Sequence, residues 1–123
     1  MFAQAWYELG SPDNVKLEIS GGGSDLQFLQ NLVHKLGIVN QVSFHGQIDY
    51  DDVPTMLNRL DIYCAFSRFE SFGVAIIEAC SCEKPVIVSD ADGPAEVVLD
   101  GVTGLLVPKE DVDISANAII RLI

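Results

Sequence analysis

The chain contains 123 residues, of which 49% are hydrophobic and 20% are charged. This length fits one domain, and the hydrophobic share is too high for a disordered chain. The 18 Asp and Glu residues outnumber the 7 Lys and Arg residues, which gives a formal net charge of −11. A nucleic-acid partner is therefore excluded, because an acidic surface repels phosphate backbones.

Neither the termini nor the cysteines indicate export or metal binding. No apolar run approaches the roughly 20 residues that a membrane-spanning helix needs. The first residues lack the basic region that precedes the apolar stretch of a secretory signal. Cys64, Cys80 and Cys82 form no C-x-x-C pair and are interpreted as small buried hydrophobes in a reducing compartment. We therefore expect a cytoplasmic domain with no metal site.

Helical and strand patterns alternate along the whole chain. The expected elements are a helix over 1–9, a strand over 16–20, a helix from Ser24 or Asp25 to Gly37, a strand over 42–45, a helix over 49–60, a strand over 62–65, a helix over 73–82, a strand over 86–88, a polar loop over 89–96, a strand over 104–107 and a helix from Asp111 onward. Such alternation predicts an α/β fold with a single, Rossmann-like parallel sheet flanked by helices. Ligands bind such sheets beyond the carboxyl ends of the strands.

The helix over 73–82 carries one notable charge. Between Ser71 and Cys82 the only charged residue is Glu78. A carboxylate on an otherwise apolar helix costs several kcal/mol to bury unless something hydrogen-bonds to it. Helical side chains tilt toward the N-terminus, so Glu78 is aimed at the helix start, beside the free amides of residues 73–75. Such amides can hold a phosphate.

Glu70 lies just before the same helix start. Two carboxylates that flank a phosphate-binding helix start could accept hydrogen bonds from hydroxyls at the two ends of a nucleotide sugar. The alternative is that Glu70 is a solvated loop residue and that Glu78 bonds a neighbouring backbone amide. The residues alone leave both interpretations open.

Glu70-x7-Glu78, with Phe72-Gly73 inside it, resembles the Glu-x7-Glu motif of family 4 glycosyltransferases, which are retaining enzymes of the GT-B fold. Five further segments are similar to the family's pattern and follow its order: Gly21–Ser24, with Ser24 in place of proline; Val42–Gly46; Glu83–Val88, with Glu83-Lys84 in place of Gly-x; Gly93–Val98, with Asp92 in place of a preceding glycine; and Asp100–Val107. The six features cover nearly the whole chain. The resemblance identifies it as the C-terminal, nucleotide-sugar-binding domain of such an enzyme.

The resemblance implies a role for each matched residue. In the family, the first glutamate contacts hydroxyls of the donor sugar and the second binds the ribose. Glu70, the catalytic candidate, and Glu78 inherit these roles. The remaining donor-binding candidates are Ser71, the backbone amides of Phe72, Gly73 and Val74, Gly22 in the glycine turn, and Gln47 and Ile48 beside the base.

The resemblance also implies the reaction. A sugar would pass from a UDP-, GDP- or ADP-linked donor to an acceptor such as a growing polysaccharide or a lipid-linked glycan, with retention of anomeric configuration. A widely considered route for this family needs no protein nucleophile. No metal or other cofactor is expected, because cationic side chains and helix amides stabilise the leaving group. The implied partners are the nucleotide sugar and an N-terminal acceptor domain, and the parent enzyme can be peripheral at the membrane.

The family places an Arg and a Lys in the strand and loop before the helix that corresponds to 1–9. We expect those cations, the first strand and the acceptor domain to lie outside this sequence. Residues 1–123 would then be a donor-binding fragment that is inactive alone.

Other classes fit less well. The glycines at 21–23 do not form a dinucleotide fingerprint, because the third glycine of G-x-G-x-x-G would fall on Leu26. The acidic run over 49–52 is interpreted as a helix start rather than a cation site. A signal-receiver domain would need an acidic pair, a phosphorylatable Asp at the end of its third strand and a late Lys, and Asp61 instead opens a strand. A non-catalytic nucleotide-sugar-binding module of the same fold remains the alternative.

Overall fold

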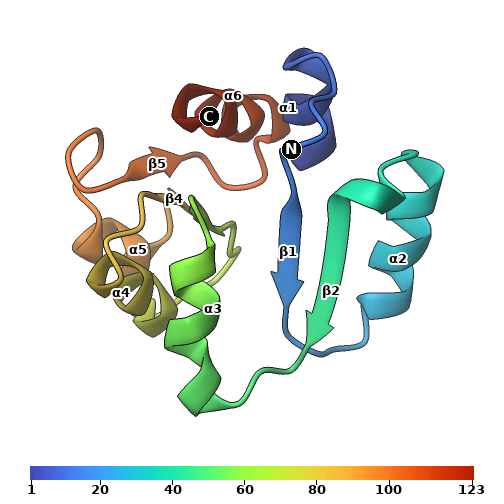
Figure 1. Cartoon of the computed structure of the whole chain (residues 1–123). Coiled ribbons are helices and arrows are strands. Elements are labelled where there is room, and N and C mark those ends of the chain that lie inside the picture. The colour runs from blue at the N-terminus through green and yellow to red at the C-terminus, as the bar shows by residue number, and fades with distance from the viewer.

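The computed structural model describes all residues, 1–123, and contains five strands and six α-helices joined by short connections (Figure 1). The strands are β1 (Leu17–Ser20), β2 (Val42–Gly46), β3 (Tyr63–Ala65), β4 (Val86–Ser89) and β5 (Leu105–Val107). The α-helices are α1 (Phe2–Glu8), α2 (Leu26–Lys35), α3 (Val53–Arg59), α4 (Val74–Ser81), α5 (Asp92–Val97) and α6 (Val112–Leu122). Two 3-10 turns, η1 (Val39–Gln41) and η2 (Tyr50–Asp52), precede β2 and α3. No helix is both long enough and apolar enough to cross a membrane.

All strand pairs are parallel, as the sequence predicts, but they form two sheets. β1 pairs with β2, starting with Leu17 opposite Val42. β3, β4 and β5 form the second sheet in that order. The prediction of a single continuous sheet is therefore wrong for these residues. β1 and β3 each have a hydrogen-bonded neighbour on one side only, and no ladder joins them, so the sheet is divided between these two strands.

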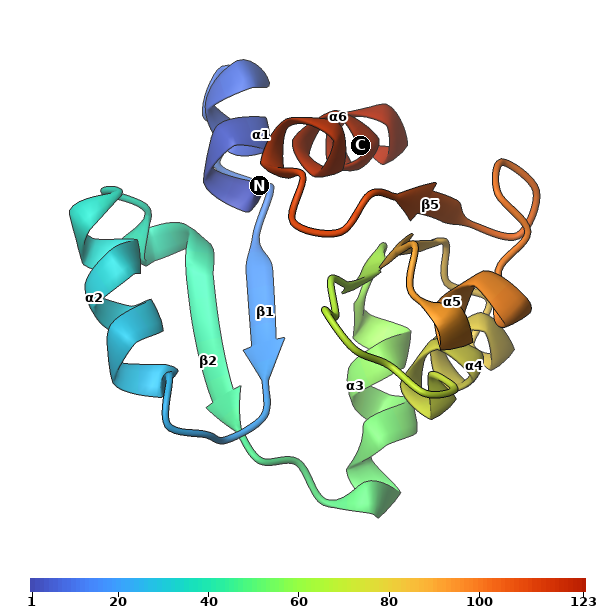
Figure 2. The ribbon, with the colours of Figure 1, turned by 180° about the vertical axis from the view of Figure 1, so that it is seen from behind.

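The core lies on both faces of β4, the only strand that is paired on two sides and buried at every position. Val86 and Val88 pack with α3 and α4, through residues such as Leu57 and Ile76. Ile87 points to the opposite face and joins a cluster with residues of α1, β5 and α6, Ala5 among them. Figure 2 shows α1 and α6 side by side, apart from α3, α4 and α5. The second sheet is thus a middle layer between two layers of helices.

Two segments depart from the expected elements. Residues 92–97, expected as part of a polar loop, form α5. This helix has only six residues and contains Gly93 and Pro94, both buried, so tertiary packing and not local propensity stabilises it. The helix expected over 49–60 is divided into η2 and α3, with Pro54 in the first turn of α3, a position where a missing N–H costs nothing.

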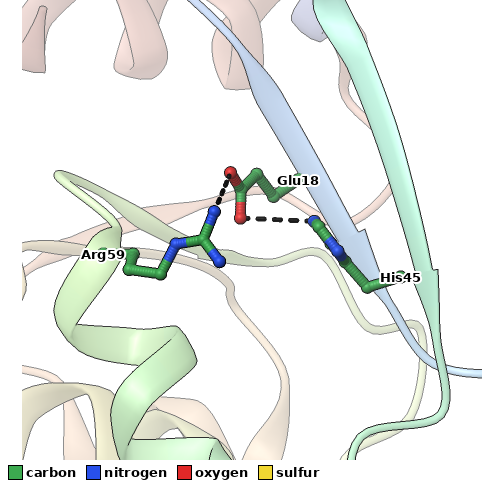
Figure 3. A network of polar contacts seen from close by, with 3 residues as sticks. All are labelled: Glu18, His45 and Arg59. Carbon is green, nitrogen blue, oxygen red and sulfur yellow. Dashed lines mark ion pairs between the residues drawn. The ribbon is translucent and has the colours of Figure 1, made fainter.

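An ion-pair network links the two halves of the molecule (Figure 3). Glu18 of β1 lies 3.6 Å from the Arg59 guanidinium at the end of α3, and 3.3 Å from His45 Nε2 in β2. The buried Oε2 atom of Glu18 therefore has a ring nitrogen nearby but no hydrogen-bond partner. Since the Arg59 side chain is 62% exposed, we expect solvent to screen its pair with Glu18 strongly.

Candidate functional site

Two groups of candidate residues lie at the carboxyl ends of strands, where parallel sheets bind ligands. The first group is in the first sheet. The Gly21 amide donates to the Gly46 carbonyl at 2.6 Å, which holds the turn after β1 against the end of β2. Three candidates therefore follow two neighbouring strand ends: Gly22, Gln47 and Ile48. Gly22 and Gln47 are exposed, and Ile48 is half-buried.

The second group is the loop between β3 and α4, which β4 and α5 hold in place. The Ser89 hydroxyl at the end of β4 donates to the Ser67 carbonyl. The Gly93 amide in α5 donates to the Glu70 carbonyl at 3.1 Å. A Cβ at Gly93 would lie 2.5 Å from the Phe72 amide nitrogen, so only glycine permits this close approach. The loop is therefore fixed by packing and by its own hydrogen bonds.

Gly73 joins this loop to α4. Its φ angle of 86° is left-handed, a conformation that favours glycine. The turn leaves the Val74 and Ala75 amides at the helix start, and neither has a hydrogen-bond partner within the chain. Free amides at the N-terminus of a helix, with the helix dipole behind them, form a local anion-binding feature.

The Glu70 carboxylate binds part of this helix start itself. Its Oε1 atom accepts hydrogen bonds from the Gly73 amide at 3.0 Å and from the Phe72 amide at 3.4 Å. The family resemblance implies that both amides bind a ligand. The alternative interpretation was that Glu70 is a solvated loop residue. In the structure Glu70 is half-buried and caps the loop, so neither description anticipated this contact.

Glu78 lies on α4, with Glu70 in the loop before that helix, as expected. It is half-buried and has no hydrogen bond or ion pair within the chain, so the bond to a neighbouring backbone amide, which was the alternative interpretation, is not formed. Burial, followed by the negative charge of Glu78, then Cys64 and Glu70, raises the pKa of Tyr63 above its usual value. The charges of both glutamates therefore act on one phenol on β3.

Sequence reasoning missed three contributors to this site. Tyr63 looked like one more apolar strand residue, and nothing in its spacing distinguished it. Ser89 and Gly93 were assigned no role in holding the loop, although Gly93 belongs to one of the segments on which the family resemblance rests. The one cation in the loop, Arg68, is paired at 2.8 Å with Glu110, and both side chains are exposed.

The sequence was compared with known proteins. The sequence model of the family "Glycosyl transferases group 1" matches residues 2–123. The chain is 35% identical over 112 residues to the phosphatidyl-myo-inositol mannosyltransferase of Mycobacterium leprae, covering 90% of this chain and 29% of that protein. It is 31% identical over 118 residues to a GDP-mannose-dependent alpha-(1-6)-phosphatidylinositol monomannoside mannosyltransferase of Mycobacterium tuberculosis, covering 90% and 31% respectively.

Solved structures show the same arrangement of elements. Anabaena HepE in complex with UDP-glucose superposes with a TM-score of 0.83 at 32% identity, covering 98% of this chain and 33% of that one. Sucrose-phosphate synthase from Thermosynechococcus elongatus gives a TM-score of 0.78 at 28% identity, covering 98% and 39%. Because nearly the whole chain superposes, the relative placement of the two sheets is the one found in these proteins.

The chain thus has the Rossmann-like, C-terminal half of the GT-B fold, as the sequence predicts. It spans about a third of the length of the curated relatives that it matches. The match over residues 2–123 includes both candidate groups and the helix that carries Glu78, and the chain belongs to the glycosyl transferases group 1 family.

Proposed function

We propose that this chain is the donor-binding part of a retaining glycosyltransferase that transfers a sugar from a nucleotide sugar to an acceptor such as a growing polysaccharide or a lipid-linked glycan. One observation carries the proposal. The partnerless amides of Val74 and Ala75 lie on the helix that also bears the partnerless carboxylate of Glu78, beyond the carboxyl end of β3. Donors for a phosphate and an acceptor for a hydroxyl are thereby presented together.

The family resemblance and this geometry together suggest a division of labour. The amides at the start of α4 hold the diphosphate, where the helix dipole favours negative charge. Glu78 accepts a hydrogen bond from the ribose. The first group, with Gly22, Gln47 and Ile48, is assigned to the nucleotide, and the Glu70 loop, with Ser71 and Phe72, to the sugar.

Glu70 must change partners for this to occur. Its carboxylate holds the Gly73 and Phe72 amides in the structure, and a hydroxyl oxygen of the donor sugar would compete for the same donors. We propose that the donor takes over the amides and that the freed carboxylate accepts a hydrogen bond from a sugar hydroxyl. The cost of breaking the cap is offset because charged hydrogen bonds are exchanged for charged hydrogen bonds.

The proposed reaction retains configuration without a protein nucleophile. The bond between the anomeric carbon and the diphosphate breaks, and its electron pair leaves with the phosphate. The acceptor hydroxyl oxygen attacks the same face, and its proton passes to the departing phosphate oxygen. The amides at the start of α4 stabilise part of the leaving charge. Relatives that are named mannosyltransferases favour this proposal over a non-catalytic nucleotide-sugar-binding module. Turnover by the full-length polypeptide would exclude the module.

Calorimetry on the full-length polypeptide tests the assignments. Glu78→Ala should weaken the binding of UDP and of UDP-glucose, or of GDP and of GDP-mannose, by the same factor, since the substitution removes a hydrogen bond to the ribose. A charged hydrogen bond is worth about 1.5–3 kcal/mol, or roughly ten- to a hundredfold in affinity. Glu78→Gln keeps the shape and an acceptor, and it should lose less.

Glu70→Ala separates the two carboxylates. This substitution should weaken the binding of the sugar-bearing donor. It should leave the binding of the bare nucleoside diphosphate nearly unaffected, because only the sugar contacts Glu70 in the proposed complex. Equal losses for the two ligands in this variant would refute the division of labour between the glutamates.

A further inference from the structure

We propose that Ser89, at the end of β4, is a positioning residue that acts through Glu70 and selects for the sugar-bearing donor over the bare nucleoside diphosphate. This role rests on the proposed function, in which Glu70 binds the donor sugar. Ser89 itself touches neither ligand. Its hydroxyl fixes the loop from which the Glu70 side chain projects.

Ser89 is the one polar residue of an apolar strand. β4 is buried at every position, and Ser89 is 2% exposed. A buried hydroxyl is unfavourable unless it forms a hydrogen bond. Its Oγ atom lies 2.5 Å from the Ser67 carbonyl oxygen and 3.5 Å from that of Ala65. Since a serine hydroxyl has a single proton to donate, the nearer oxygen, in the loop before α4, is the acceptor.

The end of β4 that carries this hydroxyl is itself held in place. The Asp90 amide, next to Ser89, donates to the Val107 carbonyl of β5 at 2.8 Å. Further along the same segment, the Gly93 amide donates to the Glu70 carbonyl at 3.1 Å. The part of the loop that ends at Glu70 is thus held at both ends, by a side chain of β4 and by a backbone amide of α5.

The Glu70 carboxylate depends on this support. Its Oε1 atom accepts hydrogen bonds from the Gly73 and Phe72 amides, so both its backbone and its side chain have defined positions. Without the Ser89 hydroxyl, the Ser67 carbonyl loses its partner and the segment is held at one end only. A binding side chain must lie within about 0.5 Å of its productive position. Loss of the hydroxyl therefore weakens the hydrogen bond from Glu70 to the sugar.

The groups assigned to the nucleotide are held by other contacts. The Val74 and Ala75 amides and the Glu78 carboxylate all belong to α4. Ile76 and Ala79 of this helix are buried in a cluster with the apolar residues of β4. The position of α4 thus depends on this packing and not on the Ser89 hydroxyl. The hydrogen bonds assigned to the diphosphate and the ribose should survive a substitution of Ser89.

Calorimetry on the full-length polypeptide measures the selectivity, with UDP-glucose and UDP as one pair of probes and GDP-mannose and GDP as the other. The quantity is the Kd of the sugar-bearing donor divided by the Kd of the bare diphosphate. Ser89→Ala should raise this ratio about 2- to 12-fold, the equivalent of one neutral hydrogen bond. Ser89→Cys keeps nearly the same volume but donates only weakly. It should raise the ratio as Ser89→Ala does, which separates the lost hydrogen bond from a cavity.

Ser115 provides a matched control. It is 1% exposed, and its hydroxyl donates to the Asp111 carbonyl at 2.6 Å, at the start of α6. Ser115→Ala therefore removes an equally buried serine hydroxyl that has no contact with the Glu70 loop, and the ratio should stay at the wild-type value. Circular dichroism and a cooperative melt establish that each variant is folded.

A double variant tests whether Ser89 acts through Glu70. Ser89→Ala combined with Glu70→Ala should give the ratio of Glu70→Ala alone, because the two residues then share one effect. Independent, multiplying effects would overturn the proposal, and so would equal losses for both ligands in Ser89→Ala and Ser89→Cys. If Glu70→Ala raises the ratio and the two Ser89 variants do not, only the role of Ser89 fails. If Glu70→Ala itself leaves the ratio unchanged, the proposed role of Glu70 fails, and that of Ser89 with it.

Discussion

Gly93 is the residue on which the shape of the candidate site depends most directly. A Cβ there would lie 2.5 Å from the Phe72 nitrogen, so Gly93→Ala must displace the Glu70 loop. We expect a loss of about 1–3 kcal/mol, as for other overpacked positions, and weaker binding of the proposed nucleotide-sugar donor. Urea denaturation and calorimetry measure the two effects. Gly23→Ala is the matched control for stability, since nothing lies within 4 Å of its Cβ. An unchanged midpoint for Gly93→Ala would contradict the proposed bracing.

Cys64 should make stability depend on alkaline pH. Burial raises the pKa of its thiol from 9.0 to about 12, so between these values the folded chain keeps a proton that the unfolded chain has lost. The contribution of the Cys64 thiol to the free energy of unfolding is fully present below pH 9. This contribution declines as the pH rises, by about 1.4 kcal/mol per pH unit, until the thiol ionises in the folded state. The raised pKa of Tyr63 acts in the same direction.

Urea denaturation at pH 8 and pH 10.5 checks this expectation. Cys64→Ala should show a smaller loss between the two pH values than the wild type, whatever its stability at pH 8. Cys82→Ala retains Cys64 and should keep the wild-type dependence. An equal loss of stability between the two pH values in wild type and Cys64→Ala would contradict the expectation. It would show that the thiol is accessible to hydroxide or that the strand opens locally.

At the scale of elements, the sequence predicts what is encoded locally. α4 follows from an apolar stretch interrupted only by Glu78, and a helix was expected to begin at about Gly73. α5 could not be anticipated, because its stability comes from burying Pro94 and from packing Gly93 against the Glu70 loop. The division into two sheets is equally non-local, since it depends on which strand edges meet. The hydrogen bonds that Glu70 accepts were equally unpredictable, because the spacing of the motif gives the position of the side chain but not the amides that donate to it.

The Arg59–Glu18 pair allows a test of how the two halves are held together. Because Arg59 is mostly exposed, Arg59→Ala should cost at most about 1 kcal/mol, and less at high salt. Denaturation at 0.05 M and 1 M NaCl measures this difference. A larger, salt-independent loss would mean that the pair is a principal link between the sheets. Arg121→Ala, outside this network, is the control.

At the scale of the molecule, the candidate site is formed by two loops that follow strand ends. Its amides and glutamates belong to a single domain, while the curated relatives are about three times as long as this chain. Binding to 1–123 alone should consequently be weaker than to the full-length polypeptide. Chemistry requires still more, because the departing diphosphate must be stabilised by charge in a site from which water is excluded, and the acceptor must be held within bonding distance.

The chain 1–123 should therefore fold without catalysing transfer. Its net charge is −11, and Arg68, the one cation in the loop before α4, is paired with Glu110, so this loop offers no unpaired cation to stabilise the departing diphosphate. The test incubates 1–123 and the full-length polypeptide with radiolabelled UDP-, GDP- and ADP-sugars and an acceptor that the full-length polypeptide uses. Circular dichroism and a cooperative melt first establish that 1–123 is folded. Transfer by 1–123 at a rate near that of the full-length polypeptide would show that the catalytic groups all lie within these residues, and that the cations assigned to another segment are not needed.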